Sequence, residues 1–390
     1  MNANKKDKTG IIFLVQYPDT TGASRIATGH MLHLLKSGYK IGLIYAMEPV
    51  SSTDDSKNHF LDELKDAGVV AICEEGLWSG INWKTLSSIR LLKSRIDASV
   101  IVGVNQRDRP VACLAGAILG MESIAYILNE HRFYGATKAF KKRAYCFLLR
   151  LFARKIIVPT QQMLDEVIRI NAGRKNKMHI VPNPADTSMF SRAESSEAEV
   201  LRNQFGVENG ELMITCVARL QPQKGILQLV ESFRIVVDNM SRPVKLVIAG
   251  DSHNDSYKNE ISNAIDTLQL ENNIVLLGST QRIPDLLSCS DIYAHSAIWE
   301  GFPVAVLEAM AAQLPSIFTD CAGELPGFID GEHGFSVPAG DPDALAKKIL
   351  TVAGMAAPQT RKMGQMARNL VLQRYDTNLV ARHFESIVTL

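Results

Sequence analysis

The chain has 390 residues, of which 46% are hydrophobic and 21% charged, and its formal net charge is +1. This length exceeds one ordinary domain and predicts two, each able to bury its own core. The composition, without a low-complexity tract, excludes a disordered or fibrous protein. The cysteines form no C-x-x-C pair, which predicts reduced core residues with neither disulfides nor zinc. They are Cys73, Cys113, Cys146, Cys216, Cys289 and Cys321.

The N-terminal segment is polar and lysine-rich over residues 2–9 and passes directly into the apolar run at residues 11–15. That run is too short for a signal peptide or a membrane span. We therefore expect a cytoplasmic protein, with attachment to the inner face of a membrane as an open alternative.

Short apolar runs alternate with helical patterns along the whole chain, which predicts a parallel α/β architecture. Strands are expected at residues 11–16, 40–45, 69–73, 99–104, 123–128, 155–158 and 178–181, then at 213–217, 245–249, 274–277, 292–294, 315–318 and 334–337. Two Rossmann-like parallel sheets result. Because ligands of such sheets bind outside the carboxyl ends of the strands, we expect the two domains to face a cleft that holds the active site.

The expected domains are residues 1–185, residues 186–372 and a final helix over 373–390 that packs back on the N-terminal domain. The two halves differ in charge. Residues 1–182 contain 26 Lys and Arg against 16 Asp and Glu, a balance of +10, and the remainder contains 16 against 25, a balance of −9.

Much of the positive excess lies in residues 132–155, where basic and apolar side chains alternate as in a basic amphipathic helix. Such a helix can lie on an anionic membrane, where each basic residue contributes about 1 kcal/mol. Its apolar face can equally pack on a sheet, with the lysines in water. The pattern leaves both alternatives open.

A basic loop follows the strand expected at 213–217 and leads into a helix. Arg219 adds a guanidinium fork and Lys224 a point charge, and helix N-termini attract phosphate, so this loop suits a diphosphate. Two solvated loop cations are the alternative. Gly250 and Gly278 stand at the ends of the next two strands, where glycine lets the backbone approach a ligand closely.

Two glutamates, Glu300 and Glu308, stand eight positions apart and bracket a turn. Gly301 and Pro303 favour entry into a helix near Phe302, which predicts Glu300 on the loop and Glu308 inside the helix. An ionised carboxylate accepts hydrogen bonds from two neighbouring sugar or ribose hydroxyls. From the spacing alone, one capping and one solvated glutamate is the competing interpretation.

With these features in order, the second half resembles the donor domain of retaining GT-B glycosyltransferases, specifically glycosyltransferase family 4, also called glycosyl transferases group 1. The glutamates match the family's E-x7-E pattern, and Arg219 and Lys224 match its basic loop. The resemblance implies that Glu308 binds the donor ribose and Glu300 the sugar hydroxyls, while Arg219 and Lys224 hold the leaving diphosphate. Further donor-binding residues implied by it are Gly250, Gly278, Gly301, Phe302, Pro303 and Val304.

In the first half, which the resemblance makes the acceptor side, Gly22 and Arg25 resemble the family's glycine loop near the donor phosphates and the acceptor. Thr21 and Ser24 depart from its usual form. His131, at a strand end, resembles the histidine that the family often carries beside the sugar, with a purely structural histidine as the alternative. The loop at residues 104–109 is a further candidate for reaching acceptor or phosphate.

The activity implied by the resemblance is retaining transfer of a hexose or N-acetylhexosamine from a nucleotide-diphosphate sugar, UDP foremost, to a glycan or lipid-linked acceptor. A front-face path is favoured, because Glu300, the obvious candidate nucleophile, is assigned to the sugar hydroxyls. No D-x-D motif stands at a strand end, so we expect no metal, and neither a cofactor nor a nucleic-acid partner.

Three other functions compete with transfer. A catalytically silent nucleotide-sugar-binding scaffold and a sugar-nucleotide epimerase on the same fold remain alternatives. A dinucleotide dehydrogenase is set aside, because residues 16–19, after the first strand, lack the glycine fingerprint.

Overall fold

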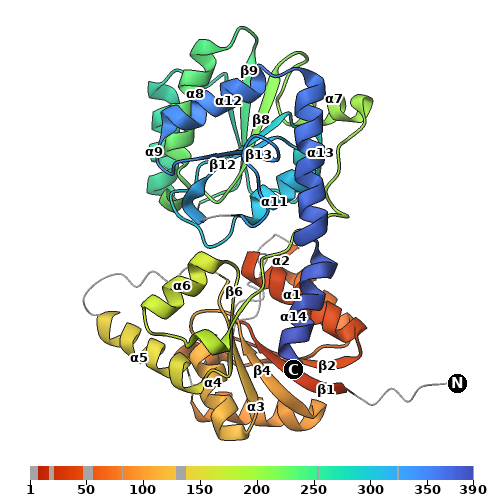
Figure 1. The fold of residues 1–390 in the computed structure, drawn as a ribbon, viewed down its shortest axis with the longest axis vertical. Helices are drawn as coiled ribbons and strands as arrows, with labels where there is room; N and C mark the ends of the chain where they lie inside the picture. Colours follow the sequence, from red (N-terminus) through yellow and green to blue (C-terminus); the bar gives the residue numbers. More distant parts are fainter. Residues whose placement is uncertain are drawn as a thin grey trace, which may run out of the picture. The chain divides into compact units, whose positions relative to one another are not determined.

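The computed structural model describes residues 8–16, 22–46, 56–80, 82–128, 138–252, 254–322 and 325–389. The chain divides into two compact units (Figure 1). The first unit comprises Met1–Asn183 together with Asn378–Leu390, and the second comprises Pro184–Thr377. Each unit has its own parallel sheet and its own hydrophobic core.

The first unit contains a seven-stranded sheet in the order β3-β2-β1-β4-β5-β6-β7. Its strands are β1 (Lys8–Leu14), β2 (Tyr39–Tyr45), β3 (Val70–Cys73), β4 (Ala98–Gly103), β5 (Glu122–Tyr126), β6 (Lys155–Val158) and β7 (Met178–Ile180). Its helices are α1 (Gly22–Lys36), α2 (Ser56–Asp66), α3 (Trp83–Ile96), α4 (Asp108–Leu119), α5 (Lys138–Phe152), α6 (Gln161–Arg169) and α14 (Thr377–Val388), with 3₁₀ turns η1 (Glu75–Ser79) and η2 (Lys175–Lys177).

The second unit contains a six-stranded sheet in the order β10-β9-β8-β11-β12-β13. Its strands are β8 (Leu212–Val217), β9 (Val244–Ala249), β10 (Ile274–Gly278), β11 (Ile292–His295), β12 (Ser316–Thr319) and β13 (Gly334–Val337). Its helices are α7 (Ser195–Gln204), α8 (Ile226–Asn239), α9 (Asp255–Thr267), α10 (Ile283–Cys289), α11 (Val304–Ala311), α12 (Pro342–Ala353) and α13 (Ala357–Arg374), with 3₁₀ turns η3 (Pro222–Lys224) and η4 (Asp320–Ala322).

The apolar runs of the sequence become strands covered on both faces. Ile12 of β1 pairs in parallel with Gly42 on one side and Ile101 on the other, and it is fully buried. In the second unit, one core lies against α8, α9 and α12, and another against α11 and α13 (Figure 1). A strand covered on both faces has no polar side to alternate with, which is why these strands are continuously apolar.

The sequence predicts these sheets well. Every predicted strand overlaps an observed one, from residues 11–16 in β1 to residues 334–337 in β13, and the pairings within both sheets are parallel. The predicted fold class of two Rossmann-like parallel sheets is therefore confirmed. A cleft between the domains concerns their relative placement and stays a prediction.

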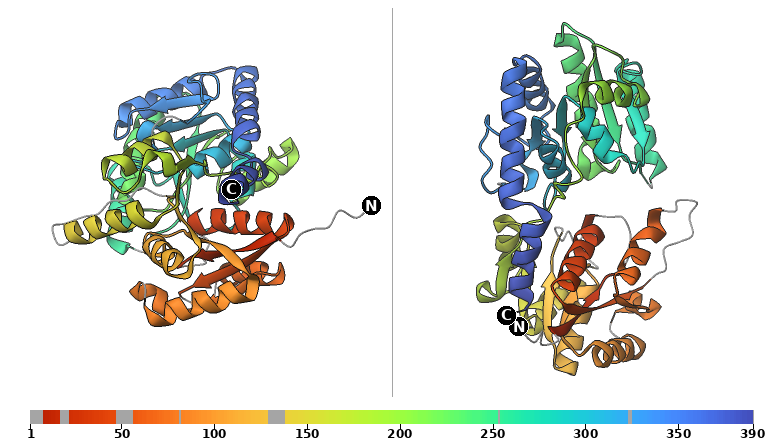
Figure 2. Two further views of the ribbon diagram at one scale, coloured as in Figure 1. Left: turned by 60° about the horizontal axis from the view of Figure 1, so that its bottom comes forward. Right: turned by 90° about the vertical axis from the view of Figure 1, so that its right-hand side faces the viewer.

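The last helix, α14, packs on α1 of the first unit (Figure 2). The ring of Phe384 stacks on that of His30, with centroids 4.2 Å apart. Glu385 accepts hydrogen bonds from Ser37 Oγ at 3.0 Å and Lys8 Nζ at 3.3 Å, and its carboxylate lies 2.9 Å from His33 Nε2. These contacts join the end of the chain to the first sheet and its leading helix.

The basic helix predicted within residues 132–155 is α5. Its apolar face contributes to the core of the first unit, where Tyr145, Cys146 and Leu149 are buried. This agrees with the alternative in which the helix packs on the sheet. Phe147 and Leu151, one turn apart, remain 62% and 50% exposed. Among the described helices, none is long and apolar enough to cross a membrane.

The cysteines are free thiols, and four of the six are buried. Burial raises the pKa of Cys216 to about 12. Cys73 is exposed, so the prediction of a core residue was wrong at this position. It is the last residue of β3, the edge strand of the first sheet, where one side of the strand has no neighbour.

Candidate active site

Four neighbouring strands of the second unit end at one edge of the sheet, and a residue singled out by sequence follows each. Gly278 ends β10, Gly250 follows β9, Arg219 lies just after β8, and Glu300 lies on the loop after β11. Parallel strands present their carboxyl ends at the same edge, where open α/β sheets bind ligands. The fold therefore gathers these residues as the sequence analysis expected.

The basic loop after β8 is fastened to the loop after β11. Ile298 N donates to Gln223 O at 2.8 Å, and Ser296 Oγ donates to Lys224 O at 3.0 Å. Gly225 has a φ of +61°, and a Cβ on it would lie 2.0 Å from Ser296 O. A glycine is needed here because two backbones touch, and this contact brings Lys224 to the glutamate loop.

Glu300 forms an ion pair with Lys224 through Oε1 and a 2.7 Å hydrogen bond with His295 Nε2 through Oε2. The three side chains are well shielded, with exposed fractions of 15% for Glu300, 11% for Lys224 and 2% for His295. Burial alone raises the pKa of Glu300. The charges and hydrogen bonds of His295 and Lys224 outweigh burial and lower that pKa to about 2. Glu300 is consequently a carboxylate across the physiological pH range.

His295 was missed by the sequence analysis. It is the last residue of β11, and its other ring nitrogen, Nδ1, lies 3.3 Å from the hydroxyl of Tyr293, which is also 3.4 Å from Val217 O. The available signal was a histidine ending the apolar strand that leads to Glu300. An imidazole buried at such a position requires polar partners.

The two glycines at the ends of β9 and β10 differ in why a glycine is needed there. Gly250 has a φ of +141°, and a Cβ there would lie 2.0 Å from Ala218 O. Its amide donates to Gly278 O at 2.8 Å. Gly278 has a φ of +69° but open space around it. Close approach at Gly250 is thus to the protein's own backbone, and approach of a ligand to either glycine stays a prediction.

Helix α11 begins at Val304, directly after Pro303, so the predicted entry into a helix near Phe302 is confirmed, with Glu300 on the loop and Glu308 inside the helix. Glu308 is only 8% exposed, which removes the interpretation of a solvated helix glutamate. The Phe302 ring is buried against Tyr375, with centroids 5.8 Å apart. Phe302 can therefore offer a donor only its backbone.

The residues predicted in the first unit are less completely described. Gly22 is the first residue of α1, and both Gly22 and Arg25 are exposed there. His131 lies outside the described residues, so its place in the site stays a prediction.

The loop at residues 104–109 contains a residue that turns inward. Arg109 is 3% exposed and donates through Nε to Tyr126 O at 2.8 Å and through Nη2 to Val104 O at 2.8 Å. Its neighbour Asp108 is fully buried and accepts from the Gln16 amide at 2.9 Å. Arg109 joins the ends of β4 and β5 through these backbone contacts, and the prediction that the loop at residues 104–109 reaches acceptor or phosphate stays a prediction.

In the described parts of the chain, no three His, Cys, Asp or Glu side chains gather as a metal-binding group. The positive charge at the carboxyl edge of the second sheet is carried by Lys224 and Arg219.

This architecture is that of known GT-B proteins. HepE of Anabaena, solved in complex with UDP-glucose, superposes with a TM-score of 0.80 at 21% identity, covering 98% of this chain and all of that chain. WaaG, a glycosyltransferase involved in lipopolysaccharide biosynthesis, superposes with a TM-score of 0.72 at 13% identity, covering 97% and 99%. The fold is therefore that of the GT-B glycosyltransferases.

Part of the chain is similar in sequence to known glycosyltransferases. Residues 197–370 match the model for glycosyl transferases group 1. An uncharacterized glycosyltransferase of Methanocaldococcus jannaschii is 33% identical over 44% of this chain and 40% of its own length. The UDP-Gal:alpha-D-GlcNAc-diphosphoundecaprenol alpha-1,3-galactosyltransferase of Escherichia coli is 28% identical over 69% of this chain and 70% of its own length. The match to the glycosyl transferases group 1 model covers residues 197–370, which is less than half of the chain and lies within the second unit.

Proposed function

We propose that this protein is a retaining glycosyltransferase that moves a hexose or N-acetylhexosamine from a UDP-sugar to a glycan or lipid-linked acceptor. The observation that carries the proposal is the carboxylate of Glu300, held by Lys224 and His295 at the carboxyl edge of the second sheet. A carboxylate has about four lone-pair sites, and two are used by these partners. Glu300 keeps acceptor capacity for two sugar hydroxyls.

The same pairing argues against Glu300 as a nucleophile. A carboxylate with a pKa of about 2, with an ammonium on one oxygen and an imidazole N–H on the other, is a poor base and a weak nucleophile. Double displacement needs an attacking carboxylate, so we favour front-face attack. In that path a leaving phosphate oxygen accepts the acceptor's proton while fixed positive charges stabilise the diphosphate.

The roles of the remaining residues follow the family pattern and the geometry. Glu308, buried in α11, is proposed to bind the donor ribose. Arg219 is exposed at the end of β8, within the edge that would receive the diphosphate. Lys224 has three N–H donors, so it can hold Glu300 and still reach a phosphate. Because these two cations supply the charge, we propose transfer without a metal ion.

Two residues of the first unit complete the proposal. We assign Gly22, at the start of α1, to the region near the donor phosphates and acceptor, and His131 to the side of the transferred sugar. Both are carried over from the family pattern.

The acceptor proposal draws on the relatives and on charge. The Escherichia coli relative is named for an acceptor carrying a diphosphoundecaprenol lipid, and WaaG for lipopolysaccharide biosynthesis. On α5 of this chain, exposed Phe147 and Leu151 lie on the helix that also carries exposed Arg143. An apolar strip beside basic side chains suits an anionic membrane surface, where a lipid-linked acceptor would lie.

Donor use is tested by screening nucleotide-sugars for thermal stabilisation and then for nucleotide release with glycan and lipid-linked acceptors. We expect a UDP-sugar to stabilise the protein and to be consumed only with a suitable acceptor. Binding without turnover under every acceptor would instead identify a silent scaffold, and a product that is an isomeric UDP-sugar would identify an epimerase. Unchanged turnover after chelation with EDTA is expected, and loss of activity would overturn the metal-free assignment.

Membrane attachment has its own test, sedimentation with vesicles of anionic lipid across a salt series. We expect binding at low salt that weakens as salt screens the charges. The double variant Phe147→Ser/Leu151→Ser should reduce binding, whereas Ile118→Ser, which removes an exposed isoleucine from α4, is the control. Absence of wild-type binding at low salt would remove the membrane proposal and leave the transfer proposal intact.

A further inference from the structure

The hydrogen-bonded row at the end of β11 connects the sheet core to the candidate sugar site. Starting from Val217 O, it passes through the Tyr293 hydroxyl and the His295 ring to Glu300, and ends at Lys224. Tyr293 and His295 are both buried on the same strand, whereas Glu300 lies on the loop that follows. The row therefore runs from a buried strand to a side chain on the loop that follows it.

The hydrogen-bond direction within this row follows from the charge of Glu300. An ionised carboxylate can only accept, so His295 Nε2 must carry the hydrogen of the 2.7 Å bond. The Tyr293 hydroxyl, which donates to Val217 O at 3.4 Å, lies 3.3 Å from His295 Nδ1. Tyr293 thereby orients the ring, as the outer partners of metal-bound histidines do.

The two partners of Glu300 differ in what else they can do. Lys224 lies on the turn before α8, and its ammonium has further donors that suit an incoming diphosphate. His295 has one nitrogen on Glu300 and the other on Tyr293, and only 2% of its side chain is exposed. His295 has no donor left for a ligand, so its effect on a ligand must pass through Glu300.

We infer that His295 is a positioning residue for the sugar site: it holds the Glu300 carboxylate in place for the sugar hydroxyls. This inference rests on the proposed transfer function and adds a residue to it. His295 contacts no part of the donor. A carboxylate held from two sides keeps its geometry as charge develops on the neighbouring diphosphate, which is what preorganisation requires.

The test compares His295→Phe, which keeps a ring but removes both nitrogens, with His295→Gln, which retains an N–H donor. For His295→Phe we expect kcat with a UDP-sugar to fall about 10- to 100-fold, as for loss of residues that support a primary ligand. Affinity for UDP alone should stay at the wild-type value, because UDP lacks the sugar that Glu300 contacts. His295→Gln should recover a large part of kcat.

A pH profile gives a second readout. The titratable groups around Glu300 are His295, Lys224, Tyr293, Cys216 and Cys321, and burial raises the pKa of both thiols and of the phenol. Removing the imidazole takes away the largest influence that lowers the pKa of Glu300, so the acid limb of kcat should move to higher pH in His295→Phe. His295→Gln should move it less.

The control is Asp291→Asn, at the other end of the same strand, where the carboxylate pairs with Arg202. It should lower the melting temperature without changing kcat or its pH profile. Wild-type kcat and pH profile in His295→Phe, or equal loss of UDP affinity and kcat in both His295 variants, would overturn the positioning role. A wild-type protein that neither binds nor consumes any UDP-sugar would overturn the proposed function itself, which is a different result.

Discussion

The second sheet carries a lysine–glutamate pair at each of its two edges, and the pairs are almost equally shielded from water. At the carboxyl edge, the Lys224 and Glu300 side chains are 11% and 15% exposed. At the amino edge, Lys245 and Glu211 are 14% and 12% exposed, with a nitrogen–oxygen distance of 3.4 Å. Residue type and burial therefore do not distinguish a functional pair from a structural one.

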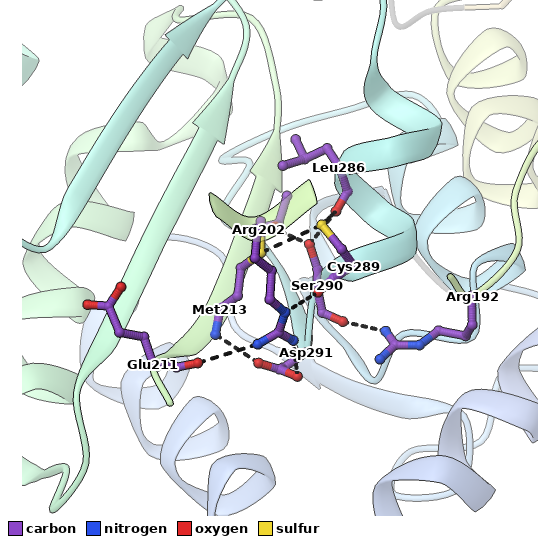
Figure 3. Close-up of polar contacts among 9 residues, drawn as sticks. Arg192, Arg202, Glu211, Met213, Leu286, Cys289, Ser290 and Asp291 are labelled. Atoms are coloured by element: carbon purple, nitrogen blue, oxygen red, sulfur yellow. Dashed lines mark hydrogen bonds and ion pairs between the residues drawn. The ribbon is translucent and has the colours of Figure 1, made fainter. Parts of the chain in front are cut away.

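The difference lies in the other partners of these charges. At the amino edge, Lys245 also donates to Asn272 O at 2.7 Å. Nearby, Arg202 binds Asp291 at 2.6 Å and donates to Cys289 O at 2.8 Å (Figure 3). Asp291 in turn accepts from the Met213 amide at 2.9 Å. Because these charged side chains also bond backbone groups, their role is to stabilise the fold.

At the carboxyl edge, the Glu300 carboxylate is bonded by the side chains of Lys224 and His295. Side-chain partners can be shared with a ligand without breaking the backbone hydrogen bonds of the sheet. A buried charge whose partners include backbone groups therefore indicates a structural role, and a buried charge whose partners are side chains at the strand ends indicates a site.

The largest expected effect is on kcat/KM, and it distinguishes Lys224 from Lys245. Lys224→Ala should reduce kcat/KM for sugar transfer by about 100-fold or more, because a charge that stabilises the leaving diphosphate is lost. Lys245→Ala removes a lysine of equal shielding and should leave kcat/KM near wild type while lowering the melting temperature. Steady-state kinetics with a UDP-sugar measure both. Near-normal transfer by Lys224→Ala would contradict the assignment of the site.

The next effect is on stability. Arg202→Ala removes the ion pair with Asp291 and leaves carbonyls of the amino edge without a donor. We expect a loss of about 1–3 kcal/mol in the free energy of unfolding. Urea denaturation measures it, and the folded fraction should retain wild-type kcat. A variant that keeps its stability but loses kcat would mean that the amino edge takes part in function.

A smaller effect is expected on stability at acid pH. The pKa of Glu300 is lowered to about 2 in the folded protein against 4.5 ordinarily, so its pairing stabilises the fold above pH 4.5 and that contribution is lost as pH falls toward 2. Glu300→Gln lacks this titration. The stability difference between wild type and Glu300→Gln should therefore shrink between pH 4.5 and about 2, as measured by denaturation at several pH values. A constant difference would show that Glu300 is not held as described.

The smallest effect tests the glycine at the end of β10. Gly278 has a φ of +69° with open space around it, so Gly278→Ala should cost only the strain of the left-handed conformation, about 1 kcal/mol. Gly225→Ala should cost clearly more, since its Cβ would also strike Ser296 O. Thermal unfolding ranks the two. Equal costs would mean that the loop around residue 225 relaxes freely.

Local pattern predicted the elements that carry the candidate site. Buried parallel strands must be continuously apolar, so their positions and the loops after them were visible in the sequence. Gly301 and Pro303 indicated the start of α11, which placed Glu300 on a loop and Glu308 in a helix, as observed. The chemical roles of these glutamates remain proposals, because a role depends on a ligand.

Local pattern failed where a side chain's partner is distant in sequence. Arg109 was grouped with loop residues, yet it turns inward to Tyr126 O, 17 positions away. His295 was overlooked because its importance depends on Glu300 and on the hydroxyl of Tyr293 above the sheet core. Nothing in the order of residues states which way a side chain points at a strand end.

The two parallel sheets could be predicted from the sequence, since apolar periodicity and turn residues are local properties that act within a few positions. The contact of Lys224 with Glu300, 76 positions further along the chain, and the bond of a buried histidine to the same carboxylate could not be predicted in this way. Such meetings depend on strand order and on close backbone contacts such as that of Gly225 with Ser296. They are set by packing, which no short stretch of sequence contains.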